Sequence, residues 1–84
     1  MGNKRRPRPK HLAKKLLSVR TQLGLTQIGM AERMSKIPSP PDGAMISRYE
    51  RGEREPSLFA LLAYARAAGV AVDVLIDDKM TLPR

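Results

Sequence analysis

Glycine and proline residues divide this chain of 84 residues into short segments. Gly24, Gly52 and Gly69 each follow a stretch with apolar residues three or four positions apart, and prolines crowd residues 38–41. Glycine readily adopts the left-handed conformation that ends a helix, whereas proline lacks an N–H and is not tolerated in a helix interior. The sequence therefore predicts an all-α fold of short helices joined by turns.

Apolar periodicity and capping residues locate the helices. Four are expected over residues 10–23, 27–34, 43–51 and 58–68, the first starting at residue 9 or 10. The N-cap residues of the last three are Thr26, Asp42 and Ser57. In the first helix, Lys14 and Lys15 fall between the apolar positions. Residues 70–76 have the β-branched composition of a short strand, but they follow Gly69 and are interpreted as a fifth helix.

A chain this short has a thin core, and its composition excludes several kinds of support. It has no Cys, and its one His, His11, lies in a basic stretch, so neither a disulfide nor a metal site is expected.

Residues 58–68 carry a single charge, Arg66, and are expected to form the central helix. A second apolar face on this helix is covered by the fifth helix or by another subunit; it consists of Phe59, Ala60, Ala63 and Ala67.

Positive charge is concentrated at the start of the chain. The sequence has 16 Lys+Arg against 8 Asp+Glu, which gives a formal charge of +8 and a pI of about 10.7. The first 20 residues hold 8 of the basic residues, and the first acid is Glu32. Pro7 and Pro9 bar a helix, so residues 1–9 are predicted to be a disordered basic arm in the free protein. Such a distribution indicates a polyanion as partner.

Two of the predicted helices have the features of a helix-turn-helix. Ala31 is a small residue that lets two helices cross closely. On the second helix, Ile46 and Tyr49 face the core, while Ser47, Arg48 and Arg51 point the other way. Arg can make a bidentate bond to guanine, and Ser can reach a base edge or a phosphate. This arrangement predicts double-stranded DNA as the partner, with residues 42–51 in the major groove.

Several motifs in order resemble the Xre family, the lambda-repressor/Cro-like helix-turn-helix domains. Residues 23–27 (Leu-Gly-Leu-Thr-Gln), followed by Met30-Ala31, are similar to its helix 1–helix 2 junction. Residues 46–52 (Ile-Ser-Arg-Tyr-Glu-Arg-Gly), followed by Pro56-Ser57-Leu58, are similar to its recognition helix and the next helix start. Residues 62–70 and then Leu75 are similar to its closing section.

The resemblance implies a five-helix lambda-repressor-like domain over residues 10–77, between the arm (1–9) and a C-terminal tail (78–84), and a homodimer on a palindrome. It implies base-reading roles for Gly43, Ala44, Ser47 and Arg48. It implies phosphate contacts at Gln27, Arg51 and Arg54, to which we add the basic residues Lys36, Arg5, Arg6 and Arg8. Gln27 also lies in a first helical turn, beside free N–H groups that favour an anion. The resemblance further implies a structural ion pair between Arg20 and Glu50.

The chain departs from the family in its helix-turn-helix connection. The family's turn is about four residues long with an early glycine. Here a proline-rich insert lengthens the connection between Met34 and Ile46, and Ser35 replaces the glycine. Gly43 and Ala44 stand where polar base-reading side chains are common. They offer only backbone or methyl contacts, such as a contact with the thymine methyl group.

Three functional hypotheses follow. The first is a sequence-specific transcriptional regulator, and the second is an antitoxin that binds both DNA and a toxin protein. The third is a cationic module for RNA or a membrane surface. An enzyme is not expected, because neither a phosphate-binding glycine loop nor a catalytic constellation is found, and no cofactor is expected. No apolar run is long enough to span a membrane and no secretion signal is evident, so a cytoplasmic, nucleoid-associated location is expected.

Overall fold

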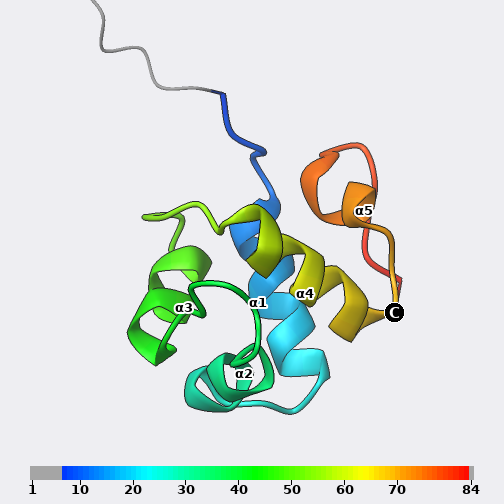
Figure 1. The fold of residues 1–84 in the computed structure, drawn as a ribbon. Helices are drawn as coiled ribbons and strands as arrows, with labels where there is room; N and C mark the ends of the chain where they lie inside the picture. The colour runs from blue at the N-terminus through cyan, green and yellow to red at the C-terminus, as the bar shows by residue number, and fades with distance from the viewer. Residues whose placement is uncertain (1–6, 84) are drawn as a thin grey trace, which may run out of the picture.

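The computed structural model describes residues 7–83, and in this range the chain forms five helices and no strand (Figure 1). The helices are α1 (Leu12–Gln22), α2 (Gln27–Arg33), α3 (Gly43–Glu50), α4 (Leu58–Ala68) and α5 (Val72–Ile76). Figure 1 shows α2 and α3 on one side of the α1–α4 pair and α5 on the other. The predicted all-α fold is confirmed, and residues 70–76 contain a helix rather than a strand. Residues 1–6 of the predicted arm lie outside the described residues.

The predicted capping residues cap the helices. Each of the three N-cap side chains accepts a hydrogen bond from the backbone N–H three positions further along the chain. These bonds join Thr26 to Gly29 (2.9 Å), Asp42 to Met45 (2.8 Å) and Ser57 to Ala60 (3.0 Å). At the other end of α4, Gly69 adopts a left-handed φ of 71°, which a residue with a side chain adopts at a cost. Local chemistry alone therefore sets these helix ends.

The start of α1 differs from the prediction. The helix begins at Leu12, not at residue 9 or 10. Asp78, from the chain segment after α5, accepts hydrogen bonds from the backbone N–H groups of Lys10 (2.9 Å) and His11 (3.1 Å). These two bonds lower the pKa of the Asp78 carboxyl group. A carboxylate distant in sequence thus holds the backbone that precedes α1, and the helix starts only after it.

The core joins all five helices. Its largest fully buried side chains are Tyr64, Leu16, Met30, Met34, Ile46, Leu75 and Val19. Met30 and Met34 fill the space between α2 and the rest of the core.

The prediction that α4 is the central helix is wrong. Helix α1 packs against α3, α4 and α5, whereas α4 packs mainly against α1 and α5. One side of α4 is left open, and Leu58 is 82% exposed and Phe59 54% exposed. An almost wholly apolar helix therefore need not be buried on every side, and the uncovered side chains form a surface of their own.

Lys15 has a role that the helical pattern concealed. Its side chain is buried, not on the polar side of α1. Its Nζ donates hydrogen bonds to the backbone carbonyls of Val74 (2.8 Å) and Asp77 (3.0 Å), at the end of α5. A cation at a helix C-terminus satisfies carbonyls that have no partner within the helix. Lys15 thus fastens the short α5 to α1.

Tyr64 carries the one buried side-chain polar atom that lacks a hydrogen-bond partner among residues 7–83. Burial, followed by the negative charge of Glu50, raises the pKa of its hydroxyl group. We expect Tyr64→Phe to raise the free energy of unfolding by about 1 kcal/mol, because an unsatisfied buried hydroxyl costs about that much. Urea unfolding followed by circular dichroism at neutral pH measures this change.

The same substitution should alter the stability at high pH. Since the pKa of Tyr64 is raised in the folded state, deprotonation favours the unfolded chain, and stability falls as pH rises above about 10. Tyr64→Phe removes this part of the fall. Tyr49→Phe is the matched control. Burial also raises the pKa of Tyr49, but its hydroxyl is not among the buried unsatisfied atoms, so this variant should gain less stability than Tyr64→Phe at neutral pH. Equal gains in the two variants would contradict the explanation.

Candidate nucleic-acid interface

The insert between α2 and α3 is anchored at its start. Met34 is buried, and Ile37 packs against the core. Beyond them, Pro38, Ser39 and Pro40 are exposed, and Ser39 has a positive φ of 49°. Helices α2 and α3 still pack directly against each other. The insert therefore extends the connection without separating the two helices.

The outer face of α3 is open to solvent. Ala44 and Arg48 are exposed and Ser47 is half-buried, while Ile46 and Tyr49 are buried on the opposite side. This is the division of faces expected from the sequence. Neither the insert nor another helix covers this side of α3, so it forms a ridge that a groove in a partner can receive.

Arg20 and Glu50 form the ion pair that the family resemblance implies. The Arg20 Nε donates to Glu50 Oε2 at 2.6 Å, and the Arg20 Nη2 donates to Glu50 Oε1 at 3.0 Å. The Arg20 Nη1 also donates to the Leu25 carbonyl oxygen at 2.9 Å. The side chains are 15% and 5% exposed, and the bond to Glu50 raises the pKa of the Arg20 guanidinium. One guanidinium therefore ties α1, the α1–α2 turn and α3 together.

Gln27 joins this pair. Its Nε2 donates a hydrogen bond to Glu50 Oε1 at 3.1 Å. The side chain was predicted to contact a phosphate, and here its amide nitrogen is used to connect α2 to α3. The predicted phosphate contact stays a prediction. The second N–H of this amide and the backbone N–H groups at the start of α2 are the donors that such a contact would use.

Gly43 lies against α2. A Cβ atom placed on it would come within 3.1 Å of the Ile28 Cγ1 atom, which is tighter than ordinary contact. The missing side chain therefore allows the start of α3 to approach the first turn of α2 closely. A base contact at this position can come only from the backbone, as the sequence indicated.

Arg51 is held by its neighbours on the protein surface. Its Nε and Nη2 donate to the two carboxylate oxygens of Glu53 at 2.9 and 3.1 Å, and its Nη1 donates to Ser47 Oγ at 2.6 Å. The bond from Arg51 lowers the pKa of Glu53. Sequence reasoning missed Glu53, although its position two residues after Arg51 was the available signal. In this arrangement Glu53 competes with any phosphate for the Arg51 guanidinium.

We expect Glu53→Gln to strengthen binding to duplex DNA, because it frees Arg51 and removes a negative charge beside it. One additional phosphate contact would steepen the dependence of log K on log salt by about 0.9, equivalent to about fivefold to tenfold in affinity near 0.1 M salt. Fluorescence anisotropy at several salt concentrations measures both quantities. Glu32→Gln removes the same charge from an exposed position on α2. An equal gain in that control would mean that only the net charge matters.

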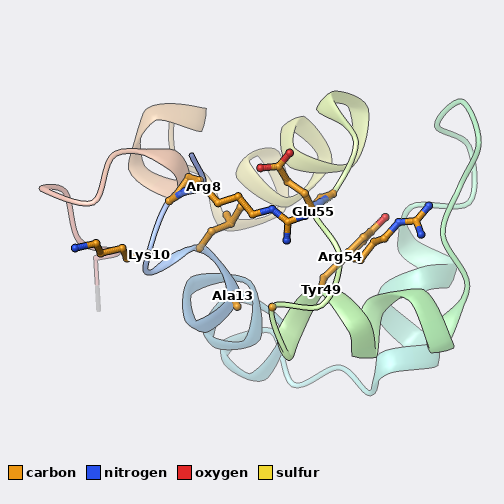
Figure 2. Close-up of a pocket in the computed structure, with 10 residues that line it drawn as sticks. Arg8, Lys10, Ala13, Tyr49, Arg54 and Glu55 are labelled. Carbon is orange, nitrogen blue, oxygen red and sulfur yellow. The ribbon is translucent and has the colours of Figure 1, made fainter. Parts of the chain in front are cut away.

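A cleft of about 200 Å³ lies between the segment before α1 and the α3–α4 loop (Figure 2). Arg8, Lys10 and Arg54 line it together with Tyr49 and Glu55. Figure 2 shows Arg8 extending toward this loop, whereas Lys10 points away from it. The structure thus brings together two predicted phosphate-binding residues, Arg8 and Arg54.

The other predicted phosphate-binding residues that the structure describes do not line this cleft. Lys36 is exposed on the insert between α2 and α3. Arg5 and Arg6 lie outside the described residues.

The packed α2–α3 pair and the open face of α3 define a helix-turn-helix domain. Residues 43–75 match the model of the helix-turn-helix family HTH_3. The structure is similar to the crystal structure of the P22 c2 repressor protein in complex with synthetic operator 9T, with a TM-score of 0.67, 24% identity, and coverage of 80% of this chain and 94% of that chain. A comparison with curated proteins gives no match. The predicted lambda-repressor-like fold is confirmed.

Two further structural findings concern other kinds of site. Between residues 7 and 83, no cluster of three or more His, Cys, Asp or Glu side chains could hold a metal ion. No helix in the same range has the length and hydropathy needed to cross a membrane.

Proposed function

We propose that the protein is a sequence-specific regulator of transcription that binds double-stranded DNA with α3 in the major groove. The observation that carries this proposal is the open outer face of α3, which presents Ala44, Ser47 and Arg48 on a rigid helix backed by buried Ile46 and Tyr49. The match to the helix-turn-helix family and the fold of the P22 c2 repressor support it. The formal charge of +8 suits a polyanionic partner.

The residues divide into readers of bases and residues that position the domain. Arg48 is suited to a bidentate bond with guanine, and Ser47 is suited to a base edge or a phosphate. Arg54 and Arg8 share one cleft, so they can grip the same stretch of backbone. The pair of Arg20 and Glu50 contributes indirectly, since it fixes the angle of α3 against α1 and α2.

Exposed apolar residues on α4 and α5 support a homodimer. The exposed Leu58 and Ile76 line an open groove together with the buried Pro56 and Leu61, and Phe59, next to Leu58 in sequence, is also exposed. A monomeric protein rarely leaves such residues grouped in water. A second copy on this surface would present two α3 helices to a palindromic site. In the alternative antitoxin function, a toxin protein occupies the same surface.

We further propose that the protein acts by binding and not by catalysis, and that it works in the cytoplasm on the nucleoid. The arrangement of cationic side chains around a projecting helix suits recognition of a polymer. Incubating the purified protein with the duplex that it binds tests the absence of catalysis, and the expected result is that the duplex is not cleaved.

Selection of bound sequences from random duplex DNA tests the proposed function. A recurring motif with two half-sites about 10 base pairs apart is the expected result for a dimer. A motif with one half-site would support the regulator but contradict the dimer. Equal binding to heparin, RNA and every duplex would overturn the proposal in favour of a nonspecific cationic module.

A further inference from the structure

Ile28 is an exposed apolar side chain at the edge of the proposed DNA-binding face. It lies in the first turn of α2 and is 67% exposed. Leaving a large aliphatic side chain in water forgoes the gain from its burial, so the core does not account for this residue. A partner that covers the Ile28 side chain would account for it.

The position of Ile28 relative to α3 identifies where that partner lies. Its Cγ1 is 3.1 Å from the place that a Cβ of Gly43 would occupy. At about 100° per residue, Ser47 falls only about 40° around α3 from Gly43, and Ala44 lies on the same side. Ile28 therefore continues the outer face of α3 toward α2, beside Gly43 and at the end of α3 where Ala44 is exposed.

The chemistry of this edge differs from that of the rest of the face. Ser47, Arg48 and Arg51 offer hydrogen bonds and charge, whereas Ile28, Gly43 and Ala44 offer only methyl, methylene and backbone groups. In the major groove, thymine is the one base that presents a methyl group, at its C5 atom. The apolar edge formed by Ile28, Gly43 and Ala44 is suited to a thymine. The polar face next to it is suited to a neighbouring base that is read by hydrogen bonds.

We infer that Ile28 is a specificity-determining residue that packs against the C5 methyl group of a thymine, next to the base contacted by Ser47 or Arg48. This inference rests on the proposed function and adds to it a base-reading residue from α2. Because Ile28 lies beside the start of α3, its side chain meets a base only when α3 itself lies in the major groove.

The test replaces single thymines of the selected duplex with deoxyuridine, which removes only the methyl group. At one position, the wild-type protein should bind about fourfold more weakly, the factor expected for burying one methyl-sized group. Ile28→Ala should bind the thymine and deoxyuridine duplexes equally well. Leu17→Ala, which truncates an exposed leucine on α1, should keep the wild-type response.

The outcomes separate this inference from the proposed function. A selected motif with no response to deoxyuridine at any position, or the same response in wild type and Ile28→Ala, overturns the role of Ile28 while specific binding stands. The absence of any selected motif overturns both. The wild-type measurement needs no variant, and circular dichroism of Ile28→Ala shows whether its helices are intact.

Discussion

Replacing Arg20 with methionine should lower the free energy of unfolding by about 3–5 kcal/mol, the cost of removing one partner from a buried ion pair. Glu50, only 5% exposed, would keep its charge and lose both bonds from the guanidinium. The amide of Gln27 would be its one remaining partner among those seen between residues 7 and 83. The Leu25 carbonyl would also lose its donor. Small domains have a total stability of about 5–15 kcal/mol, so this loss would be a large fraction of the total.

Urea unfolding of three variants tests this explanation. Arg66→Met removes an exposed arginine from α4 and should change the stability little. The double variant Arg20→Met/Glu50→Met should recover much of the loss, because it leaves no buried charge without a partner. A double variant as unstable as Arg20→Met alone would contradict the explanation. The loss would then come from the packing of the Arg20 side chain and not from the charge left on Glu50.

The sequence predicted the parts of the fold that depend on neighbouring residues. The capping side chains of Thr26, Asp42 and Ser57 bond to backbone groups three positions away, so their effect is visible in a short window of sequence. For that reason the start of α3 was predicted correctly despite the insert before it. The helical identity of residues 70–76 was also predicted, from their place after Gly69.

The parts that sequence reasoning missed depend on contacts between distant residues. Lys15 bonds to carbonyls near residues 74 and 77, and Asp78 bonds to the backbone before α1. At about 100° per residue, Lys15 lies about 60° from Leu12, at the margin of the apolar stripe, whereas the exposed Lys14 lies about 160° from it. The helical repeat thus allows Lys15 to approach the core, but it does not show which groups Lys15 bonds. These contacts form only when α5 packs against α1, so no periodicity or propensity could indicate them.

In the candidate site, too, the features set by neighbouring residues were predicted from the local pattern and those set by distant contacts were not. The outward direction of Ser47 and Arg48 follows from the helical repeat, and the structure agrees with it. The pair of Arg20 and Glu50 came from family resemblance, because the two residues are 30 positions apart. The contact of Ile28 with Gly43 depends on how closely α2 and α3 cross, which only the three-dimensional packing decides.

Replacing Arg48 with alanine should weaken binding to the selected duplex by about 1–3 kcal/mol and relax the preference at one base pair. Within the described part of the chain, the Arg48 side chain is exposed and takes part in no hydrogen bond or ion pair, whereas Arg51 is held by Glu53 and Ser47. In the proposed base contact, Arg48 would therefore have no protein partner to give up first. Titrations against the best duplex and against variants at each base pair measure the loss and its position.

Arg48→Lys and the salt dependence distinguish a base contact from a phosphate contact. Lysine keeps the charge but lacks the planar fork that bonds guanine at two atoms, so it should restore little of the lost preference. A lost base contact leaves the salt dependence unchanged, whereas a lost phosphate contact lowers the slope of log K against log salt by about 0.9. If lysine restores the affinity, or if alanine weakens binding equally on all sequences, Arg48 contacts the backbone. The reading of bases by α3 would then depend on Ser47 and on the apolar edge formed by Ile28, Gly43 and Ala44.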